Sequence, residues 1–546
     1  MKSPTLSTRI PGDWWFHVLA AATVGFGIAL RVIQYLAQEP TWYDESAWAL
    51  LTLTKPLDEL LIRPVGYLWV TRWVMTNTAV NELTLRLLPF VGAVGSQILV
   101  WGIARHLFSS RFAQWVAIFL FAVHFWFIDY AAEGKPYSFE LFSHLLIVWM
   151  VLKYLARPTL VLAIVVGASA TAGFFFAYNL AFLYPALFTV CFFRAVRNRP
   201  REAARREGLA VAIGAAMCFL VVVGVYGWLL APSAEFEFEG YYSRSSNTFY
   251  DPTNPLHSDS SQISWLAQRV FELVESPLLT RRWIGTLQLK WDSRSQPSLK
   301  GGSGIDLKRL QSMCWIFLYI LALAHLIWKR RWNVLALLVS PTLFAIAFNV
   351  AGRWPFGLFR INLFLIGYFL LMGVVGIEAF ILIQRGRWQW LSKTLVLALF
   401  VAPPLAWGFE WYDPKSWTRS DTRAALAQLR EIRRLELRAD PAAPRRPLYM
   451  DLWSCDNFEF YSRWHAAYRE AGAAMHRDFD VRCERFFEDI TEALSKQREP
   501  VAWLALSRPP DVRIARKQLS EHCRSAQWNR KRGKTPFLVR CVPVKR

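Results

Sequence analysis

The sequence lacks the short motifs that mark nucleotide-binding and redox enzymes. It contains no P-loop, no G-x-G-x-x-G fingerprint and no C-x-x-C pair, and no internal repeat of the solenoid kind. Histidines are few, and those outside the apolar runs show no spacing typical of metal ligands: His257, His465, His476 and His522. The motifs therefore indicate no nucleotide or redox cofactor and leave metal dependence undecided.

Acidic residues are also fewer than basic ones, 41 against 63, which gives a formal net charge of +22. In a soluble protein this excess would suggest nucleic acid binding. Here the basic residues cluster between apolar runs instead, most densely in FRAVRNRPREAARR (193–206). Every such cluster falls on one predicted side of a membrane. The positive-inside rule then predicts a cytoplasmic N-terminus, and no nucleic acid partner is expected.

Apolar and aromatic residues are abundant: 54% of the chain is hydrophobic, 15% is aromatic, and there are 27 tryptophans. Aromatic residues in such numbers are typical of the belts at membrane interfaces. Many apolar runs approach the ~20 residues that cross a hydrocarbon core. They predict a polytopic α-helical membrane protein with about eleven transmembrane helices: 15–36, 87–104, 112–128, 139–155, 159–178, 180–193, 209–231, 312–328, 333–350, 360–383 and 394–411. The first run is too long for a signal peptide and lacks its cleavage site, so we expect a retained span.

An odd number of spans predicts which segments lie on the outer side. These are two large loops, two short turns and the tail: 37–86, 232–311, 129–138, 351–359 and 412–546. The first loop mixes apolar and charged residues, and the apolar ones recur with helical spacing. This pattern predicts one or two amphipathic helices in the membrane plane. In the long loop, EFEFEGYY (235–242) predicts a short strand and GGSG (301–304) a flexible joint.

The division into domains follows from this topology. Residues 1–411 form the predicted membrane domain, and residues 412–546 form a small α/β domain outside. The tail is expected to contain helices at 416–438 and 482–494 and strands at 447–452, 501–507 and 537–544. Four tail cysteines predict two disulfides in one of three pairings, with free buried thiols as the alternative: Cys455, Cys483, Cys523 and Cys541.

The most unusual stretch is EPTWYDESAWALL (39–51), where the chain leaves the first span. Asp44 and Glu45 stand side by side there, preceded by Trp42 and Tyr43. Adjacent carboxylates repel each other and resist desolvation, so they need either open water or a function. A helix cap or a solvated pair is the alternative to a catalytic role.

Two further outer segments carry charge beside aromatic residues. FIDYAAEGKPYSFELF (127–142) places these five residues at the mouth of two spans: Asp129, Glu133, Lys135, Tyr137 and Glu140. AGRWPFGLFRINLFL (351–365) contains Arg353 and Arg360, whose outer position opposes the positive-inside bias. These arginines call for an anionic partner, either a phosphate, which guanidinium binds bidentately, or one of the carboxylates. An interfacial anchor with a local ion pair is the alternative for the first segment.

Carboxylates, cations and aromatic rings at one membrane face suit the transfer of a group from a lipid phosphate to a hydroxyl. A carboxylate would accept the proton of the attacking hydroxyl. Lysine or arginine would bind the phosphate and offset the charge that grows on it as the bond breaks. Aromatic faces would contact a sugar ring or the lipid chain.

The ordered set of outer motifs also resembles a known family. The acidic pair is followed by RLLPFVGAVGSQILVWGIARHLF (86–108), YAAEGKPYSFEL (130–141) and RWPFGLFRINLFL (353–365). This set is similar to bacterial members of the GT-C superfamily, which are polyprenyl-phosphate-sugar-dependent glycosyltransferases related to protein O-mannosyltransferases and the aminoarabinose transferase of lipid A. One departure is IRPVGYLWV (62–70), where many relatives have Pro-Pro, so the role of Arg63 stays open.

The resemblance implies a GT-C fold, a polyprenyl-phosphate-linked sugar donor, and inverting transfer to a glycan, lipid or protein acceptor at the outer face of the bacterial inner membrane. It implies that one of Asp44 and Glu45 is the general base, and that the other orients the acceptor or binds a metal. Donor-binding roles fall on Glu133, Lys135 and Tyr137, and with less support on Arg353 and Arg360. Trp42, Tyr43, Arg63 and Asp129 are candidates for acceptor or loop contacts. Some relatives use a divalent cation such as Mg²⁺ or Mn²⁺ and others do not.

Three other functions compete with this prediction. A transporter would place its charged residues near the midplane within repeated halves, which this sequence does not show. A receptor anchored by its spans would leave the paired carboxylates without a purpose. A polymerase or ligase that uses lipid-linked oligosaccharides is a neighbour within the enzyme class and would need room for a longer donor.

Overall fold

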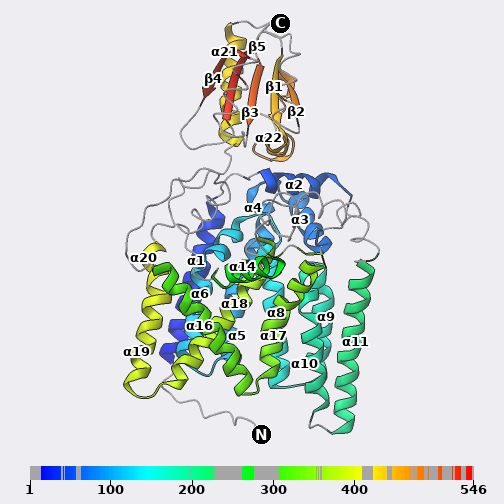
Figure 1. Cartoon of the computed structure of the whole chain (residues 1–546). Helices are drawn as coiled ribbons and strands as arrows, with labels where there is room; N and C mark the ends of the chain where they lie inside the picture. Colours follow the sequence, from blue (N-terminus) through cyan, green and yellow to red (C-terminus); the bar gives the residue numbers. More distant parts are fainter. Residues whose placement is uncertain are drawn as a thin grey trace.

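The computed structural model describes residues 14–37, 41, 43–56, 63–197, 200–225, 227, 261–275, 307–351, 353–354, 356, 360–408, 422–439, 445–468, 473, 476–484, 490, 502–506, 519, 523–529 and 537–543. A helical membrane portion carries a small sheet domain, built from the C-terminal residues, at one end (Figure 1). The strand expected at 235–242 and the joint expected at 301–304 lie outside the described residues. So do Trp42 and the side chains of Tyr43 and Arg360.

The chain is a multi-pass integral membrane protein. Among the described residues, seven helices are long and apolar enough to cross a membrane, and an eighth span results if a bent pair of helices counts as one. The seven are α1 (Trp14–Leu36), α5 (Leu87–Leu107), α8 (Tyr137–Ala156), α11 (Arg201–Val225), α16 (Leu307–Trp328), α17 (Trp332–Val350) and α18 (Leu363–Ile383). The bent pair is α6 (Arg111–Val123) with α7 (Phe125–Asp129) and η2 (Tyr130–Ala132).

This number is lower than the eleven spans predicted, although every predicted segment contains a helix. Two helices are short: α9 (Leu160–Phe174) has 15 residues and α10 (Tyr184–Val196) has 13, with the 3₁₀ turn η3 (Tyr178–Phe182) between them. At ~1.5 Å per residue neither reaches the ~30 Å of a hydrocarbon core. The last segment is divided into α19 (Arg387–Val396), the π-helical η8 (Leu397–Val401) and α20 (Ala402–Gly408).

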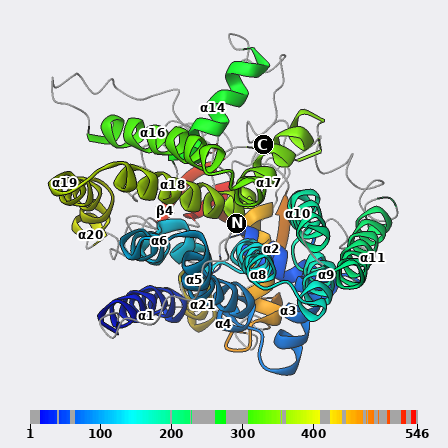
Figure 2. The same cartoon turned by 90° about the horizontal axis from the view of Figure 1, so that it is seen from below.

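Helix α18 forms the centre of the membrane portion, and 78% of an apolar 18-residue stretch within it is buried by protein. It lies between α16 on one side and α6 on the other (Figure 2). The close approach to α16 depends on glycine, because a side chain at Gly376 would collide with the backbone of Leu318, and one at Gly373 with the ring of Trp315. Small residues at such contacts are typical of helix packing in membranes.

We expect the substitution Gly376→Ala to destabilise this contact by about 1–3 kcal/mol, the usual cost of overpacking. The added methyl group meets backbone atoms of α16, which cannot rotate away. Thermal unfolding in detergent should show a lower melting temperature. Gly25→Ala in α1 is the matched control, because no atom lies within 4 Å of its added carbon. Equal melting temperatures for the two variants would contradict this account of the packing.

The bend between α6 and α7, of 56°, has a visible partner in α1. A break in a helix leaves carbonyl groups without their usual amide donors, which is costly in a membrane. The guanidinium group of Arg31 donates to the carbonyls of Phe121 and Ala122 at 2.8 and 3.2 Å, and to its own helix at Gly27. Arg31 is 1% exposed. It therefore stabilises the bend.

The first outer loop forms three helices: α2 (Tyr43–Thr54), α3 (Val65–Asn77) and α4 (Glu82–Leu85). They lie at the end of the bundle that faces the sheet domain, and α2 runs across the bundle rather than along it (Figure 1). On α3, Trp69 and Trp73 are each 57% exposed. Exposed tryptophans are typical of a helix at the membrane interface. Helix α14 (Gln262–Glu275) lies in the long loop predicted to be outside, and η7 (Arg360–Asn362) directly precedes α18.

The tail contains a five-stranded sheet in the order β2-β1-β3-β5-β4. Its strands are β1 (Arg446–Asp451), β2 (Phe479–Glu484), β3 (Ala502–Leu506), β4 (Cys523–Asn529) and β5 (Phe537–Pro543), and its helices are α21 (Thr422–Ala439), α22 (Leu452–Glu459) and η11 (Phe460–Trp464). β1 pairs in parallel with β2 and β3, whereas β5 pairs antiparallel with β3 and β4. The three predicted strands are confirmed.

One tail prediction is wrong. The stretch 482–494 was expected to be helical, but its first residues, Arg482–Glu484, end strand β2 and pair with Tyr449–Asp451. The rest of that stretch lies outside the described residues except for Ile490, which is helical. Pairing with β1 overrides the helical periodicity of that stretch. Both disulfides are present, Cys455 with Cys483 and Cys523 with Cys541. The alternative of free tail thiols is therefore excluded. The boundary expected between residues 411 and 412 falls among residues that the structure does not describe.

The tail domain rests on the first outer loop, with α22 and η11 against α2 (Figure 1). An apolar cluster joins the two. From the loop it contains Ala49, Leu50, Met75 and Leu85, and from the tail Leu429, Leu448, Met450, Phe458, Phe460, Tyr461 and Phe479. Burial of this apolar surface favours docking at roughly 25 cal/mol for each Å² removed from water.

Candidate active site

Glu45 is the most firmly held acidic residue of the first loop. It lies in the first turn of α2, where the helix dipole favours negative charge. Arg86 Nε and Nη2 donate to its two carboxylate oxygens, each at 2.9 Å, and the backbone N–H of Gly134 donates to Oε1 at 2.7 Å. Glu45 is 0% and Arg86 1% exposed. Three segments far apart in the sequence therefore meet at one carboxylate.

Asp44 has a different environment. Its Oδ1 lies 2.7 Å from Nζ of Lys135, and its side chain is 22% exposed whereas that of Lys135 is 4% exposed. The Lys135 ammonium also lies 4.9 Å from the ring centroid of Trp48, and the Arg63 guanidinium lies 4.6 Å from the same centroid. Both cations face an aromatic ring, an arrangement that stabilises positive charge. Of the adjacent acids, Asp44 is the one that solvent reaches.

The turn that carries Lys135 is almost wholly buried. Asp129, Glu133 and Tyr137 are 5%, 4% and 6% exposed. Glycine is required at position 134, because a side chain there would lie 2.6 Å from Cγ of Leu85. The turn is thus pressed against α4, which aims the Gly134 amide at Glu45. Asp44, Glu45, Lys135 and Arg63, all predicted as site residues, are brought together around Trp48.

Arg353 is not part of this group. Its side chain is exposed, and among the described residues no hydrogen bond or ion pair connects it with Asp44, Glu45 or Lys135. The neighbouring Trp354 turns inward, where its indole N–H donates to Asn362 at 2.9 Å. The side chain of Arg360 lies outside the described residues. A phosphate-binding role for these two arginines stays a prediction.

Sequence reasoning missed Arg86 as a site residue. It stands between α4 and the start of α5, on the side predicted to be outside, where the positive-inside rule disfavours a basic residue. That bias drew attention to Arg353 and would have applied equally to Arg86. What the sequence could not indicate is that a buried carboxylate 41 positions earlier is its partner.

The missed acidic residue is Glu82. Its carboxylate accepts from Tyr461 at 2.9 Å and lies 2.7 Å from Nε2 of His465, both in the tail. Burial alone would raise the pKa of Glu82. The hydrogen bonds from His465 and Tyr461 and the charge of His465 outweigh burial and lower this pKa to about 2. Glu82 is therefore ionised at neutral pH, and its hydrogen bonds to the tail are charge-assisted.

A second polar group lies deeper in the bundle. Asn179 donates to Glu140 at 2.9 Å and contacts His144 at 3.1 Å, and His144 contacts the hydroxyl of Tyr368 at 3.0 Å. All four are buried. Polar side chains inside a membrane bundle find partners because an unsatisfied group there is costly. This chain of contacts joins α8, η3 and α18.

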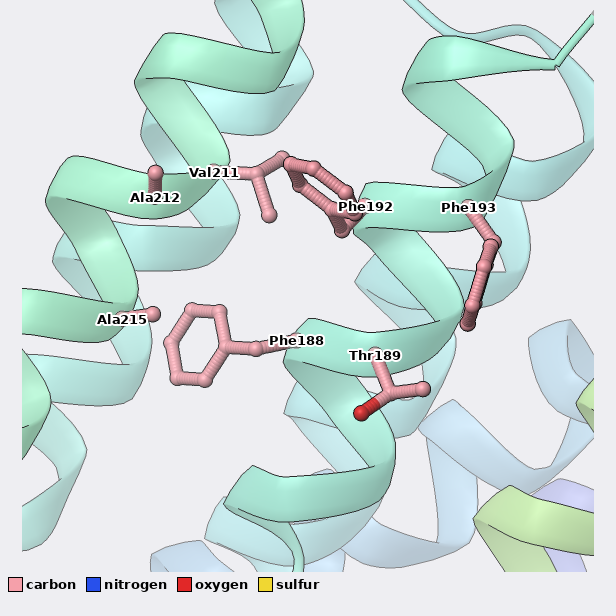
Figure 3. Close-up of a pocket in the computed structure, with 7 residues that line it drawn as sticks. All are labelled: Phe188, Thr189, Phe192, Phe193, Val211, Ala212 and Ala215. Carbon is pink, nitrogen blue, oxygen red and sulfur yellow. The ribbon is translucent and has the colours of Figure 1, made fainter.

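The described residues offer an apolar hollow but no metal site. Within the described ranges, no group of three or more His, Cys, Asp or Glu side chains could hold a metal ion. A hollow of about 290 Å³ lies between α10 and α11, lined by Phe188, Thr189, Phe192, Phe193, Val211, Ala212 and Ala215 (Figure 3). It contains no charged side chain and suits an apolar chain rather than chemistry.

Residues 62–228 match the family model described as dolichyl-phosphate-mannose-protein mannosyltransferase. The match covers these residues and not the remainder of the chain. It includes Arg86 and the turn with Lys135, whereas Asp44 and Glu45 precede it. The resemblance to membrane glycosyltransferases, and the enzyme class inferred from it, are confirmed.

Some solved structures are also similar to the chain, at low identity. ArnT from Cupriavidus metallidurans is 12% identical, with 97% of this chain and 98% of that chain covered; the TM-score is 0.48 in the apo state and 0.46 bound to undecaprenyl phosphate. The apo oligosaccharyltransferase of Archaeoglobus fulgidus is 12% identical with a TM-score of 0.44 over 82% of this chain. This chain spans 64% of that archaeal protein's length. No curated protein matches the chain.

Proposed function

We propose that the chain transfers a sugar from a polyprenyl-phosphate donor to an acceptor hydroxyl at the outer face of the bacterial inner membrane. The observation that carries this proposal is the pair formed by Asp44 and Lys135 beside the buried pair formed by Glu45 and Arg86. One member of each pair lies in the region that matches the mannosyltransferase family. A partly exposed acid next to a buried cation suits a base next to a phosphate site.

In this proposal Asp44 is the general base and Glu45 is not. Glu45 accepts three hydrogen bonds and is 0% exposed, so an acceptor hydroxyl cannot approach it without breaking those bonds. Asp44 is reachable by solvent. It takes the proton of the acceptor hydroxyl, and the acceptor oxygen bonds to the anomeric carbon. The bond from that carbon to the phosphate oxygen breaks, and the electron pair leaves with the polyprenyl phosphate. Attack opposite the leaving group inverts the anomeric carbon.

In this proposal Lys135 binds the phosphate of the sugar donor. Its ammonium group is 4% exposed and held between Asp44 and Trp48. A phosphate that contacts Lys135 would share this cation with Asp44 and weaken the ion pair. Donor binding would thereby release Asp44 to accept a proton, which links occupancy of the donor site to the activity of the base.

The proposal also includes the topology of a GT-C fold. All eleven predicted segments would cross the membrane, with α9, α10 and the broken α19–α20 segment as short or irregular spans inside the bundle. The N-terminus would then be cytoplasmic and the sheet domain periplasmic. The two disulfides of the tail support an oxidising compartment, since disulfides are rare in the cytosol.

The donor side is tested by direct binding of a polyprenyl phosphate to the purified protein. We expect Lys135→Gln to weaken binding roughly 10- to 100-fold, because it removes a charge-assisted hydrogen bond of about 1.5–3 kcal/mol. Lys153→Gln is the matched control: Lys153 lies in the last turn of α8, and its ammonium group is 3.7 Å from the ring centroid of Trp149. Equal affinity for wild type and both variants would overturn the assignment of Lys135.

A further inference from the structure

Two side chains of the tail domain reach the segments that hold the candidate active site. The hydroxyl of Tyr461 accepts a hydrogen bond from the backbone N–H of Thr41 at 2.9 Å and donates to Oε1 of Glu82 at 2.9 Å. Nε2 of His465 lies 2.7 Å from the other oxygen of Glu82. Tyr461, Thr41 and Glu82 are 0%, 0% and 3% exposed. These contacts are therefore shielded from water.

The first of these segments leads directly into α2. Thr41 precedes Asp44 by three positions, and its hydroxyl shares a 2.7 Å hydrogen bond with that of Ser46, which follows Glu45. Thr41 and Ser46 thus bracket the acidic pair from both sides. Fixing the Thr41 backbone against Tyr461 fixes the point at which the acidic turn begins.

The second segment is the short helix α4, which leads to Arg86. Asn81 and Thr84 form a capping box at its start, and the backbone N–H of Arg86 donates to the carbonyl of Glu82 at 3.1 Å. The tail contacts the start of this helix at two points, Glu82 and Val80, because the N–H of Ala466 also donates to the carbonyl of Val80 at 2.9 Å. Movement of Glu82 would therefore move Arg86, which is the ion-pair partner of Glu45.

We propose that Tyr461 and His465 are positioning residues, through which the tail domain joins the start of α2 to α4 and so sets the geometry of Asp44, Glu45 and Arg86. The catalytic consequence rests on the proposed function, but the structural clamp does not. A hydroxyl that bridges both segments is suited to this purpose, since small displacements of reacting groups are costly in rate. The membrane domain alone would then contain every candidate catalytic residue and still be a poor enzyme.

The test compares Tyr461→Phe with the matched control Tyr449→Phe in the full-length protein. Tyr449 is equally buried in the tail, and its hydroxyl accepts from Arg482, within the same domain. Hydrogen exchange is measured on the peptides that cover residues 41–54 and 79–90. We expect Tyr461→Phe to speed exchange in both peptides at least tenfold, whereas Tyr449→Phe leaves them at the wild-type rate.

Sugar transfer supplies the second readout. Tyr461→Phe should lower kcat roughly 10- to 100-fold with little change in KM for the donor, because the clamp orients reacting groups without touching the lipid. His465→Gln, which can still donate to Glu82, should retain more activity than His465→Ala. If Tyr461→Phe does not fold, the two His465 variants give the same exchange measurement.

The outcomes separate this inference from the function on which it rests. Faster exchange in both peptides, in a protein whose wild type transfers no sugar, would support the clamp and reject the proposed function. Wild-type exchange in both peptides for Tyr461→Phe and His465→Ala would overturn the clamp, whatever the activity.

Discussion

Replacing Asp44 with asparagine is expected to lower the rate of sugar transfer by about 10²–10⁴-fold, the usual contribution of a general base. Asparagine preserves the shape of the side chain and can still contact Lys135, but it cannot accept the proton of the acceptor hydroxyl. Because Asp44 is partly exposed at the start of α2, and the amide oxygen of asparagine can still accept from Lys135, we expect the variant to fold, with a smaller loss of stability than the loss of a fully buried ion pair would cause. Initial rates with a polyprenyl-phosphate sugar measure the effect.

The matched control for this substitution is Asp480→Asn. Asp480 also accepts from a basic side chain at 2.7 Å, that of Arg482, but it lies on strand β2 in the tail. Its loss should leave transfer at the wild-type rate. An Asp44→Asn protein with full activity would remove Asp44 as the base, and the assignment of roles within the acidic pair would have to be reversed or abandoned.

Replacing Arg86 with glutamine should have the largest effect on stability. The substitution leaves Glu45 buried without its bidentate partner, and an uncompensated buried charge of this kind costs about 3–5 kcal/mol. We expect a marked fall in the melting temperature and in the yield of folded protein. Arg72→Gln is the control in the same loop, because Arg72 donates to the backbone carbonyls of Thr52 and Lys55 and lies nearer to solvent.

The double substitution of Glu45 and Arg86 by methionine distinguishes stability from function. With both charges removed, no buried charge is left unpaired, and most of the lost stability should return. Transfer should stay impaired, because the acidic turn no longer has its anchor on α5. A single Arg86→Gln variant as stable as Arg72→Gln would contradict the assignment of Glu45 as a structural anchor.

The sequence predicted those features that depend on local pattern. Apolar runs located helices at all eleven expected segments, and alternating apolar residues located β1, β3 and β5. Length alone could not tell continuous spans from α9 and α10, because 3₁₀ turns and π-helical segments leave no clear trace in hydropathy. The first residues of the stretch 482–494 were misassigned because its helical periodicity competes with pairing to β1, a contact that only the folded sheet supplies.

The candidate site shows the same limit. Asp44, Glu45 and Lys135 were found because charge next to an apolar span is unusual, and their mutual contact follows from the fold. Arg86 satisfied the same criterion and was missed for lack of a visible partner. The contacts of Glu82 with Tyr461 and His465 join positions more than 370 residues apart. No periodicity or spacing rule reaches across such a separation, so a coordinate structure was needed to reveal them.

The most direct test of the central claim is an experimental structure of the protein with a polyprenyl phosphate added. The account predicts phosphate density within hydrogen-bonding distance of Lys135 Nζ, facing Asp44, with Glu45 still bound to Arg86. Phosphate density elsewhere, with the ion pair between Asp44 and Lys135 intact and open only to bulk water, would contradict it. The acidic pair would then be a structural feature of the outer loop, and the catalytic residues would have to be sought in another part of the chain.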